Sequence, residues 1–165
     1  MKSTGEVMGV GKTFGEAFVK SQIGAGTKLP TSGKVFLTVK NADKARAVDI
    51  ARQLVALGFD LVATKGTAAA IEAAGVPVKV VNKVTEGRPH IVDMIKNNEI
   101  VMVINTVEER RNAIADSRAI RTSSLLARVT TFTTIFGAEA AVEGMQHMEQ
   151  LGVISIQDMH AQLAA

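Results

Sequence analysis

The chain has 165 residues, of which 47% are hydrophobic and 21% are charged, and Phe is its only aromatic residue type. This length and composition fit one compact α/β domain with a short additional segment. Without cysteine the chain has no disulfide and no thiolate metal ligand, and its three histidines are too scattered to indicate a metal site. A net charge of +3 without Trp or Tyr does not favour nucleic-acid binding. No apolar run is long enough for a membrane span or a signal peptide, so we expect a cytoplasmic protein.

The first 26 residues are rich in glycine and differ from the rest of the chain. Thr13 and Glu16 have the spacing of a capping box, which predicts a helix over about 13–23. Its apolar residues, Phe14 and Ile23 among them, would need a surface to cover. A short glycine-rich segment with one apolar helix is typical of the end of a larger preceding unit.

From residue 34 onward, apolar strands alternate with helices. We expect strands over 35–39, 60–63, 78–81, 100–104 and 129–132. We expect helices over about 44–57, 67–74, 90–97, 116–127 and 155–161, and one more after Thr133-Thr134 that ends at Met148. Asp116-Ser117 is predicted to cap its helix. Successive strand and helix units with continuous apolar strands predict a parallel sheet covered by helices on both faces, a three-layer α/β/α fold.

The turn Thr64-Lys65-Gly66-Thr67 follows one of these strands and opens a helix. A helix N-terminus presents unpaired backbone N–H groups and the positive end of the helix dipole. Hydroxyls add hydrogen bonds, and glycine allows a ligand to approach closely, so the turn is suited to a phosphate. The alternative is that Thr67 only caps the helix and Gly66 only turns the chain.

The ends of the other strands favour the phosphate site. Ligands of open parallel sheets bind beyond the carboxyl ends of the strands. Here those ends carry amides, hydroxyls and lysines, in 38–44, 64–67, Asn82-Lys83 and Asn105-Thr106. Such a set suits a phosphate and the polar edges of a nucleotide, but it lacks paired carboxylates and a serine beside a histidine, so it does not favour acid/base catalysis. His90 and Asp93, one helical turn apart, are interpreted as a surface hydrogen bond and not as a catalytic pair.

Several longer runs resemble one known family. They are Ser3-Thr4-Gly5-Glu6-Val7-Met8-Gly9, Val81-Asn82-Lys83-Val84, Glu86-Gly87-Arg88-Pro89-His90-Ile91, Ile104-Asn105-Thr106 and Asp116-Ser117-Arg118. Through them the chain resembles the C-terminal regulatory domain of the carbamoyl-phosphate synthase large subunit, which has the methylglyoxal-synthase-like fold. The resemblance implies a five-stranded parallel sheet in the order 3-2-1-4-5. It also implies that residues 1–26 are the last piece of an ATP-grasp synthetase unit and that 27–165 form the allosteric domain.

The same resemblance implies a regulatory function without catalysis or cofactors. Domains of this family bind UMP as an inhibitor and IMP as an activator, and act on the remainder of the large subunit and, through it, on the glutaminase small subunit. The matching positions here are Lys44, Thr64, Gly66, Thr67, Lys83, Asn105, Thr106, Asp116 and Ser117. By this match the two threonines of the turn and Lys83 would hold the phosphate. Asn105 and an Asp116-Ser117 turn would face the ribose or the base.

The chain departs from the family pattern at two places. Val107 stands where some relatives have a second threonine, and the loop that follows is one residue longer. Ornithine activates some relatives at a site to which a tyrosine contributes. The tyrosine position is Thr131 here and only Thr133 matches, which does not favour ornithine control.

Two other functions are weighed against regulation. Methylglyoxal synthase resembles the chain in fold and eliminates phosphate from dihydroxyacetone phosphate. It needs an aspartate in the loop after the third strand, where 83–89 offers only Glu86, and a His-Asp pair where Lys40-Asn41 stands. We therefore predict no lyase activity. A structural module without any ligand is the least favoured function, because polar residues gather at the strand ends.

Overall fold

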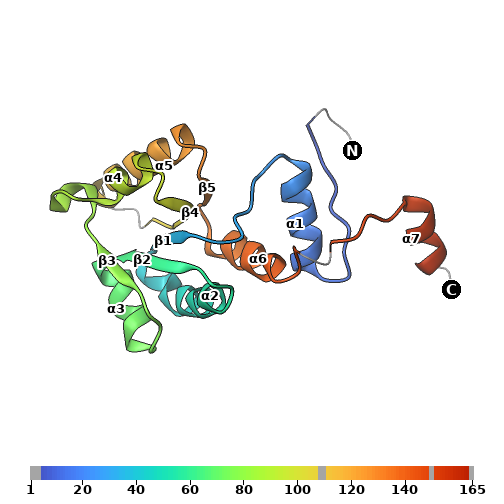
Figure 1. Ribbon diagram of the computed structural model, residues 1–165, viewed down its shortest axis with the longest axis horizontal. Helices are drawn as coiled ribbons and strands as arrows, with labels where there is room; N and C mark the ends of the chain where they lie inside the picture. Colours follow the sequence, from blue (N-terminus) through green and yellow to red (C-terminus); the bar gives the residue numbers. More distant parts are fainter. Residues whose placement is uncertain (1–4, 108–110, 149–150, 164–165) are drawn as a thin grey trace.

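The structure, a computed structural model, describes residues 5–107, 111–148 and 151–163. Five parallel strands form one sheet in the order β3-β2-β1-β4-β5 (Figure 1). The strands are β1 (Lys34–Thr38), β2 (Asp60–Thr64), β3 (Lys79–Val81), β4 (Ile100–Asn105) and β5 (Thr130–Phe132). The parallel sheet and the strand order expected from the sequence are confirmed.

In chain order, the helices of the described ranges are α1 (Phe14–Gly24), α2 (Lys44–Ala56), α3 (Lys65–Ala73), α4 (Ile91–Lys96), α5 (Arg111–Leu126), α6 (Ile135–Met145) and α7 (Ile156–Leu163), with short 3-10 helices η1 (Asn41–Asp43) and η2 (Val84–Glu86). The helices from α2 to α6 cover the two faces of the sheet. Helices α2, α3 and α6 share one core with the sheet, and α4 and α5 share the other (Figure 1). No helix in the described ranges is both long and apolar enough to cross a membrane.

Alternating strand residues separate the two cores. In β1, Val35 and Leu37 face the α2, α3 and α6 side, whereas Phe36 between them faces α4 and α5. The pairing of β1 with β4 shifts by one residue, so that Lys34 pairs with Ile100 but Val35 with Met102. The extra residue interrupts the alternation of side chains between the two faces of β4. For that reason Ile100 belongs to the α4 and α5 core, although Met102, two residues later, belongs to the other.

The parallel strands bring their carboxyl ends to one edge of the sheet. Thr38 at the end of β1 pairs with Asn105 at the end of β4, and Thr64 at the end of β2 pairs with Val81. Helices α2 and α3 begin at the same edge because each follows β1 or β2 closely along the chain. This edge therefore gathers strand ends and helix N-termini, as the sequence predicted.

Two helices begin earlier than the sequence indicated. Helix α3 starts at Lys65 with Thr64 at the N-cap position, so Thr67 lies in its first turn and is not its cap. Helix α5 starts at Arg111, and the prediction that Asp116-Ser117 caps it or forms a turn is wrong. The chain continues helically through both residues, which places their side chains on the side of a helix.

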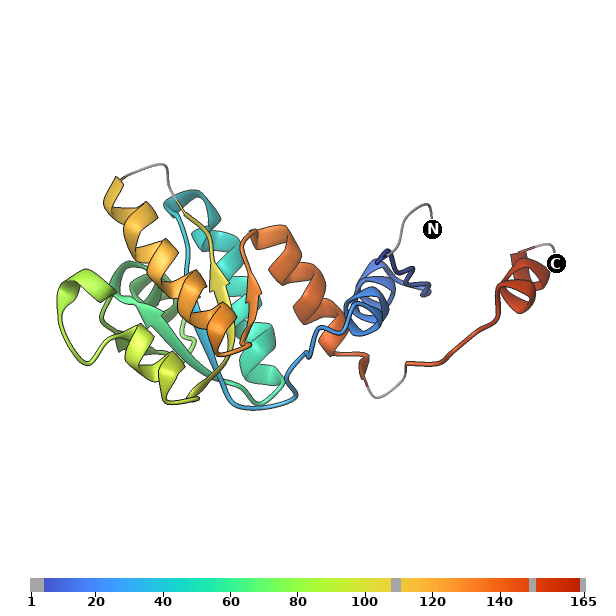
Figure 2. The ribbon, with the colours of Figure 1, turned by 90° about the horizontal axis from the view of Figure 1, so that it is seen from above.

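The N-terminal helix packs in a different way from the one expected. Thr13 caps α1, since its Oγ1 accepts a hydrogen bond from the Glu16 N–H, but Phe14 remains 71% exposed. The residues of α1 that are buried are Gly15 and Val19, which lie against α6. Figure 2 shows α1 beside α6 at the side of the sheet, and α7 beyond it at the end of an extended segment. The predicted helix over 155–161 is confirmed within α7.

Candidate functional site

A cavity of about 180 Å³ opens at the carboxyl edge of the sheet. All nine residues predicted for the site line it: Lys44, Thr64, Gly66, Thr67, Lys83, Asn105, Thr106, Asp116 and Ser117. The other lining residues are Thr38, Val39, Lys40, Asn41, Val107 and Ile120. Residues from five separate segments of the chain therefore meet around one space.

Threonine hydroxyls bind the strand ends to one another on the floor of the cavity. Thr64 Oγ1 donates to Thr38 Oγ1 at 3.1 Å and lies 3.5 Å from Thr67 Oγ1. Thr67 Oγ1 accepts a hydrogen bond from the Val39 N–H at 3.1 Å. Because the Thr67 hydroxyl accepts this bond, its own hydrogen remains available to a ligand. On the other side of β1, Thr106 Oγ1 accepts from the Lys40 N–H at 3.1 Å.

The α2 and α3 side of the cavity is suited to an anion. The Thr64 side chain makes no capping hydrogen bond to α3, so it leaves the first-turn N–H groups of that helix available. Within the described part of the chain, Lys44 and Lys83 form no ion pair. Gly66 keeps its own surroundings open, and a Cβ there would lie 3.7 Å from Lys44 Nζ. Two lysines and the positive end of a helix dipole thus face the same space.

Helix α5 supplies the opposite wall with a different chemistry. Asn105 Nδ2 donates to Ser117 Oγ at 3.0 Å, and this bond connects the end of β4 to α5. Asp116 is only 8% exposed, and its Oδ2 accepts a hydrogen bond from Thr85 Oγ1 at 3.2 Å. Its Oδ1 is buried and receives no hydrogen bond from any described group. A buried carboxylate oxygen without a partner is costly in free energy, and a ligand with a hydroxyl or N–H donor would satisfy it.

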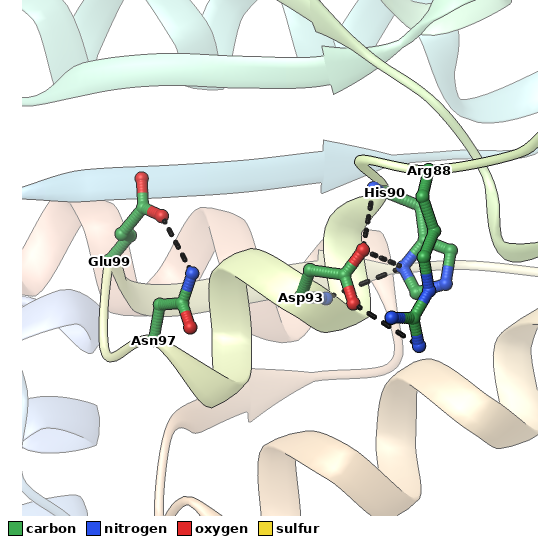
Figure 3. A network of polar contacts seen from close by, with 5 residues as sticks. All are labelled: Arg88, His90, Asp93, Asn97 and Glu99. Atoms are coloured by element: carbon green, nitrogen blue, oxygen red, sulfur yellow. Dashed lines mark hydrogen bonds and ion pairs between the residues drawn. The ribbon is translucent and has the colours of Figure 1, made fainter.

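His90 and Asp93 lie outside the cavity, at the N-terminus of α4 (Figure 3). The His90 N–H donates to Asp93 Oδ2 at 3.1 Å, and Asp93 also pairs with Arg88 at 3.7 Å. The pair therefore caps a helix, as expected of a local hydrogen bond. His90 is buried, however, so the prediction of a surface contact is wrong on that point.

Two further sequence predictions fall elsewhere. Thr133, the position matched to ornithine binding, is exposed after β5 and is not among the residues that line the cavity. The longer loop after Val107 lies outside the described residues, and so do Ser3 and Thr4 of the first resembling run.

Sequence reasoning missed two features of the site. Ile120 lines the cavity one turn after Asp116, and an earlier predicted start of α5 would have revealed it, since residues four apart share a helix face. The contact of Thr85 with Asp116 joins two segments 31 residues apart, and the sequence carries no signal for it.

Comparison with known proteins identifies the family of the chain. The family model described as "MGS-like domain" matches residues 46–133, more than half of the chain. The chain belongs to the MGS-like domain family. Of the nine predicted site residues of this MGS-like domain, only Lys44 lies outside the matched range.

The similarity to curated relatives extends beyond the MGS-like range. The chain is 63% identical over 163 residues to the carbamoyl phosphate synthase large chain of Ralstonia nicotianae, which covers 99% of this chain. It is 54% identical over 165 residues to the large chains of Pseudomonas putida and Pseudomonas aeruginosa. The chain spans 15% of the length of each of these relatives.

Proposed function

We propose that this MGS-like domain is the non-catalytic regulatory domain of a carbamoyl phosphate synthase large chain, a cytoplasmic enzyme of arginine and pyrimidine biosynthesis. Its cavity binds nucleoside monophosphates, with UMP as inhibitor and IMP as activator. The similarity to carbamoyl phosphate synthase large chains over nearly the whole length of this chain supports the parent enzyme. The observation that carries the ligand class is a combination in one cavity: among the described groups, Lys44 and Lys83 on one wall form no ion pair, and a buried carboxylate oxygen of Asp116 on the other has no donor.

The phosphate would bind on the α2 and α3 side. Lys44 and Lys83 supply positive charge, and the first-turn N–H groups of α3 together with the Thr67 hydroxyl supply directed donors. Hydrogen bonds to a charged group contribute roughly 1.5–3 kcal/mol each. Two or three of them, after the cost of association, support a dissociation constant on the order of micromolar.

The ribose or the base would bind against α5. Asp116 Oδ1 needs a donor, and both ribose hydroxyls and the N–H of a uracil or hypoxanthine ring can provide one. Asn105 and Ser117 are already hydrogen-bonded to each other, so they form a fixed polar surface beside it. Inorganic phosphate alone would bind the cationic wall formed by Lys44 and Lys83, and it would leave Asp116 Oδ1 without a partner among the described groups.

A lyase of the methylglyoxal synthase type is the second candidate, because the cavity does contain one carboxylate. Elimination needs a base that can reach the substrate and then release its proton. Among the described residues Asp116 is the one carboxylate that lines the cavity, and no histidine does. Glu86, the carboxylate of the loop after β3, accepts a hydrogen bond from the Lys83 N–H at 2.9 Å and does not line the cavity. We therefore expect no methylglyoxal from dihydroxyacetone phosphate.

Regulation requires that the cavity communicate with the rest of the enzyme. The partners in this proposal are the remainder of the large chain and, through it, the glutaminase small subunit. Helix α1 joins the domain to the preceding segment and packs directly on α6. A coupling free energy of about 1–3 kcal/mol changes substrate affinity several-fold, provided that the two nucleotides bind unequally to two arrangements of the enzyme.

We propose that ornithine does not bind in this cavity. Thr133, its matched position, is exposed beyond β5 and does not line the cavity, so an ornithine site at Thr133 would be separate from the nucleotide site. Binding of ornithine in competition with UMP would contradict this separation.

Calorimetric titration of the chain with UMP, IMP, ornithine and dihydroxyacetone phosphate tests the proposed function. We expect micromolar binding of the two nucleotides, mutual competition between them, and no heat of reaction with dihydroxyacetone phosphate. Turnover to methylglyoxal above background would favour the lyase, and absence of nucleotide binding would overturn the regulatory assignment.

A further inference from the structure

Thr85 contacts the site without lining it. It lies in the 3-10 helix η2, and its Oγ1 donates to Asp116 Oδ2 at 3.2 Å. Thr85 is exposed, whereas the carboxylate that it contacts is buried. Among the described groups this hydroxyl is the one hydrogen-bond partner of the Asp116 side chain, since Oδ1 has none.

A single bond to one oxygen fixes where the other oxygen points. A carboxylate is planar, and rotation about its last side-chain torsion is broad and weakly restrained on its own. With Oδ2 held by Thr85, the plane of the carboxylate is fixed in the wall of the cavity that Asp116 and Ser117 line, and Oδ1 is buried without a partner among the described groups. Without the Thr85 hydroxyl, no hydrogen bond from a described group holds that plane in this orientation.

The turn that carries Thr85 is itself held in place. Glu86 closes it twice, because its carboxylate accepts from the Lys83 N–H at 2.9 Å and its own N–H donates to the Lys83 carbonyl at 3.1 Å. At the far end of the segment, Arg88 and His90 both bind Asp93 at the start of α4 (Figure 3). Thr85 therefore presents its hydroxyl from an anchored turn whose first residue, Lys83, lines the cavity.

We propose that Thr85 is a positioning residue of the nucleotide site, which orients the Asp116 carboxylate so that it accepts a hydrogen bond from the ligand's ribose hydroxyls. This inference rests on the proposed function. Two adjacent hydroxyls on a ribose are donors that a carboxylate accepts well, and a nucleotide without them leaves Oδ1 unsatisfied. Thr85 thus affects selection of the sugar and does not touch the ligand.

A purely structural role for Thr85 has a different consequence. If its hydroxyl only held the turn, its loss would displace Lys83, and the binding of every phosphate ligand would weaken together. If it orients Asp116, the binding of inorganic phosphate and of a nucleotide without ribose hydroxyls would stay unchanged. The choice of ligands therefore separates the two roles.

The test is calorimetric titration of the 165-residue chain with UMP, 2′,3′-dideoxyuridine monophosphate and inorganic phosphate. Thr85→Val keeps the shape and removes the hydroxyl, and Thr85→Ser keeps the hydroxyl as the matched control. We expect Thr85→Val to weaken UMP binding about fivefold and to leave the other two ligands unchanged, in line with the loss of one hydrogen bond to a charged group. Thr85→Ser should retain the affinity for UMP.

A double variant tests whether the effect of Thr85 on UMP affinity acts through Asp116. In the Asp116→Asn background, Thr85→Val should cause no further loss of UMP affinity, because the oriented carboxylate is already absent. Three outcomes would each overturn this inference and leave the proposed function standing. The first is equal UMP affinity of the wild type and Thr85→Val, and the second is equally weakened binding of all three ligands. The third is that the losses of UMP affinity in the double variant are additive. Failure of the wild type to bind UMP would overturn the proposed function, and this inference with it.

Discussion

The cavity at the strand ends and the crossing of α1 over α6 are packed in opposite ways. The cavity leaves about 180 Å³ open and keeps Asp116 Oδ1 without a donor. At the crossing there is no room for a single methyl group. A Cβ on Gly144 would collide with the Val19 side chain and the Gly15 carbonyl oxygen, and a Cβ on Gly15 would lie 2.8 Å from Glu143 Cγ.

The difference shows which region serves binding and which serves stability. Unsatisfied polar groups destabilise the free protein and become favourable only when a ligand arrives. Close packing contributes to stability and leaves nothing for a ligand to fill. We therefore expect substitutions in the cavity to change affinity with little effect on unfolding, and substitutions at the crossing to do the reverse.

The largest effect is expected at the crossing. Gly144→Ala should lower the free energy of unfolding by up to about 3 kcal/mol, because the added methyl group meets backbone as well as a side chain and α1 must shift. Chemical denaturation monitored by circular dichroism measures the change. Gly152→Ala is the matched control, since a Cβ there meets nothing within 4 Å.

The same variant also tests whether UMP affinity depends on packing at the crossing. UMP affinity of Gly144→Ala should equal that of the wild type, because the cavity is lined by other elements. A parallel loss of UMP affinity would mean that the crossing and the cavity are one coupled unit.

The second largest effect is expected at Lys83, in the cationic wall of the cavity. Lys83→Ala should weaken nucleotide binding at least tenfold, or about 1.4 kcal/mol, because it removes an unpaired ammonium group from the cavity. The affinity of Lys83→Ala for inorganic phosphate should fall by the same factor. Lys79→Ala serves as control, since Lys79 is exposed on the edge strand β3 and does not line the cavity. Unchanged affinity of Lys83→Ala in calorimetry would count against a phosphate at this wall.

A smaller effect is expected at Asp116, where a substitution should weaken UMP binding without lowering stability. Asp116→Asn should weaken UMP binding about fivefold and leave inorganic phosphate binding unchanged. It should also leave the thermal midpoint of the free chain equal or higher, because the negative charge of a buried carboxylate is removed, whose Oδ1 has no partner among the described groups. A lower midpoint together with unchanged affinity would show that Asp116 supports the fold and not the ligand.

The strands could be predicted because their sequence signal is local. Short runs rich in apolar and β-branched residues marked all five, but the strand order came from the resemblance to a family and not from periodicity. The start of α5 was missed because the segment 107–115 is rich in charge and resembles a loop. The buried face of α1 was missed because apolar size pointed to Phe14, whereas the close approach to α6 requires Gly15.

The candidate site shows the same division between local and tertiary information. The nine lining residues that were predicted lie at strand ends or in short family motifs, so a rule about parallel sheets and a few runs of sequence were enough to gather them. The orientation of Asp116 depends instead on Thr85, which only the folded chain brings near. Pattern reasoning identified which residues meet but not how they hold one another.

The smallest effect is expected at the exposed start of α1 and concerns pH. The ion pair with Lys20 lowers the pKa of Glu16 below its ordinary value, and the Lys12 N–H adds to the effect. Because the folded pKa lies below the unfolded one, the stabilisation is present above the unfolded pKa, about 4.3 for glutamate, and is lost as the pH falls through the folded pKa. Glu16→Gln should therefore be less stable than the wild type at pH 7, by a margin that shrinks as the pH falls below the unfolded pKa and also shrinks in high salt. Denaturation curves over a descending pH series measure the margin, and a margin that stayed constant across the series would show that the glutamate acts through packing and not through its charge.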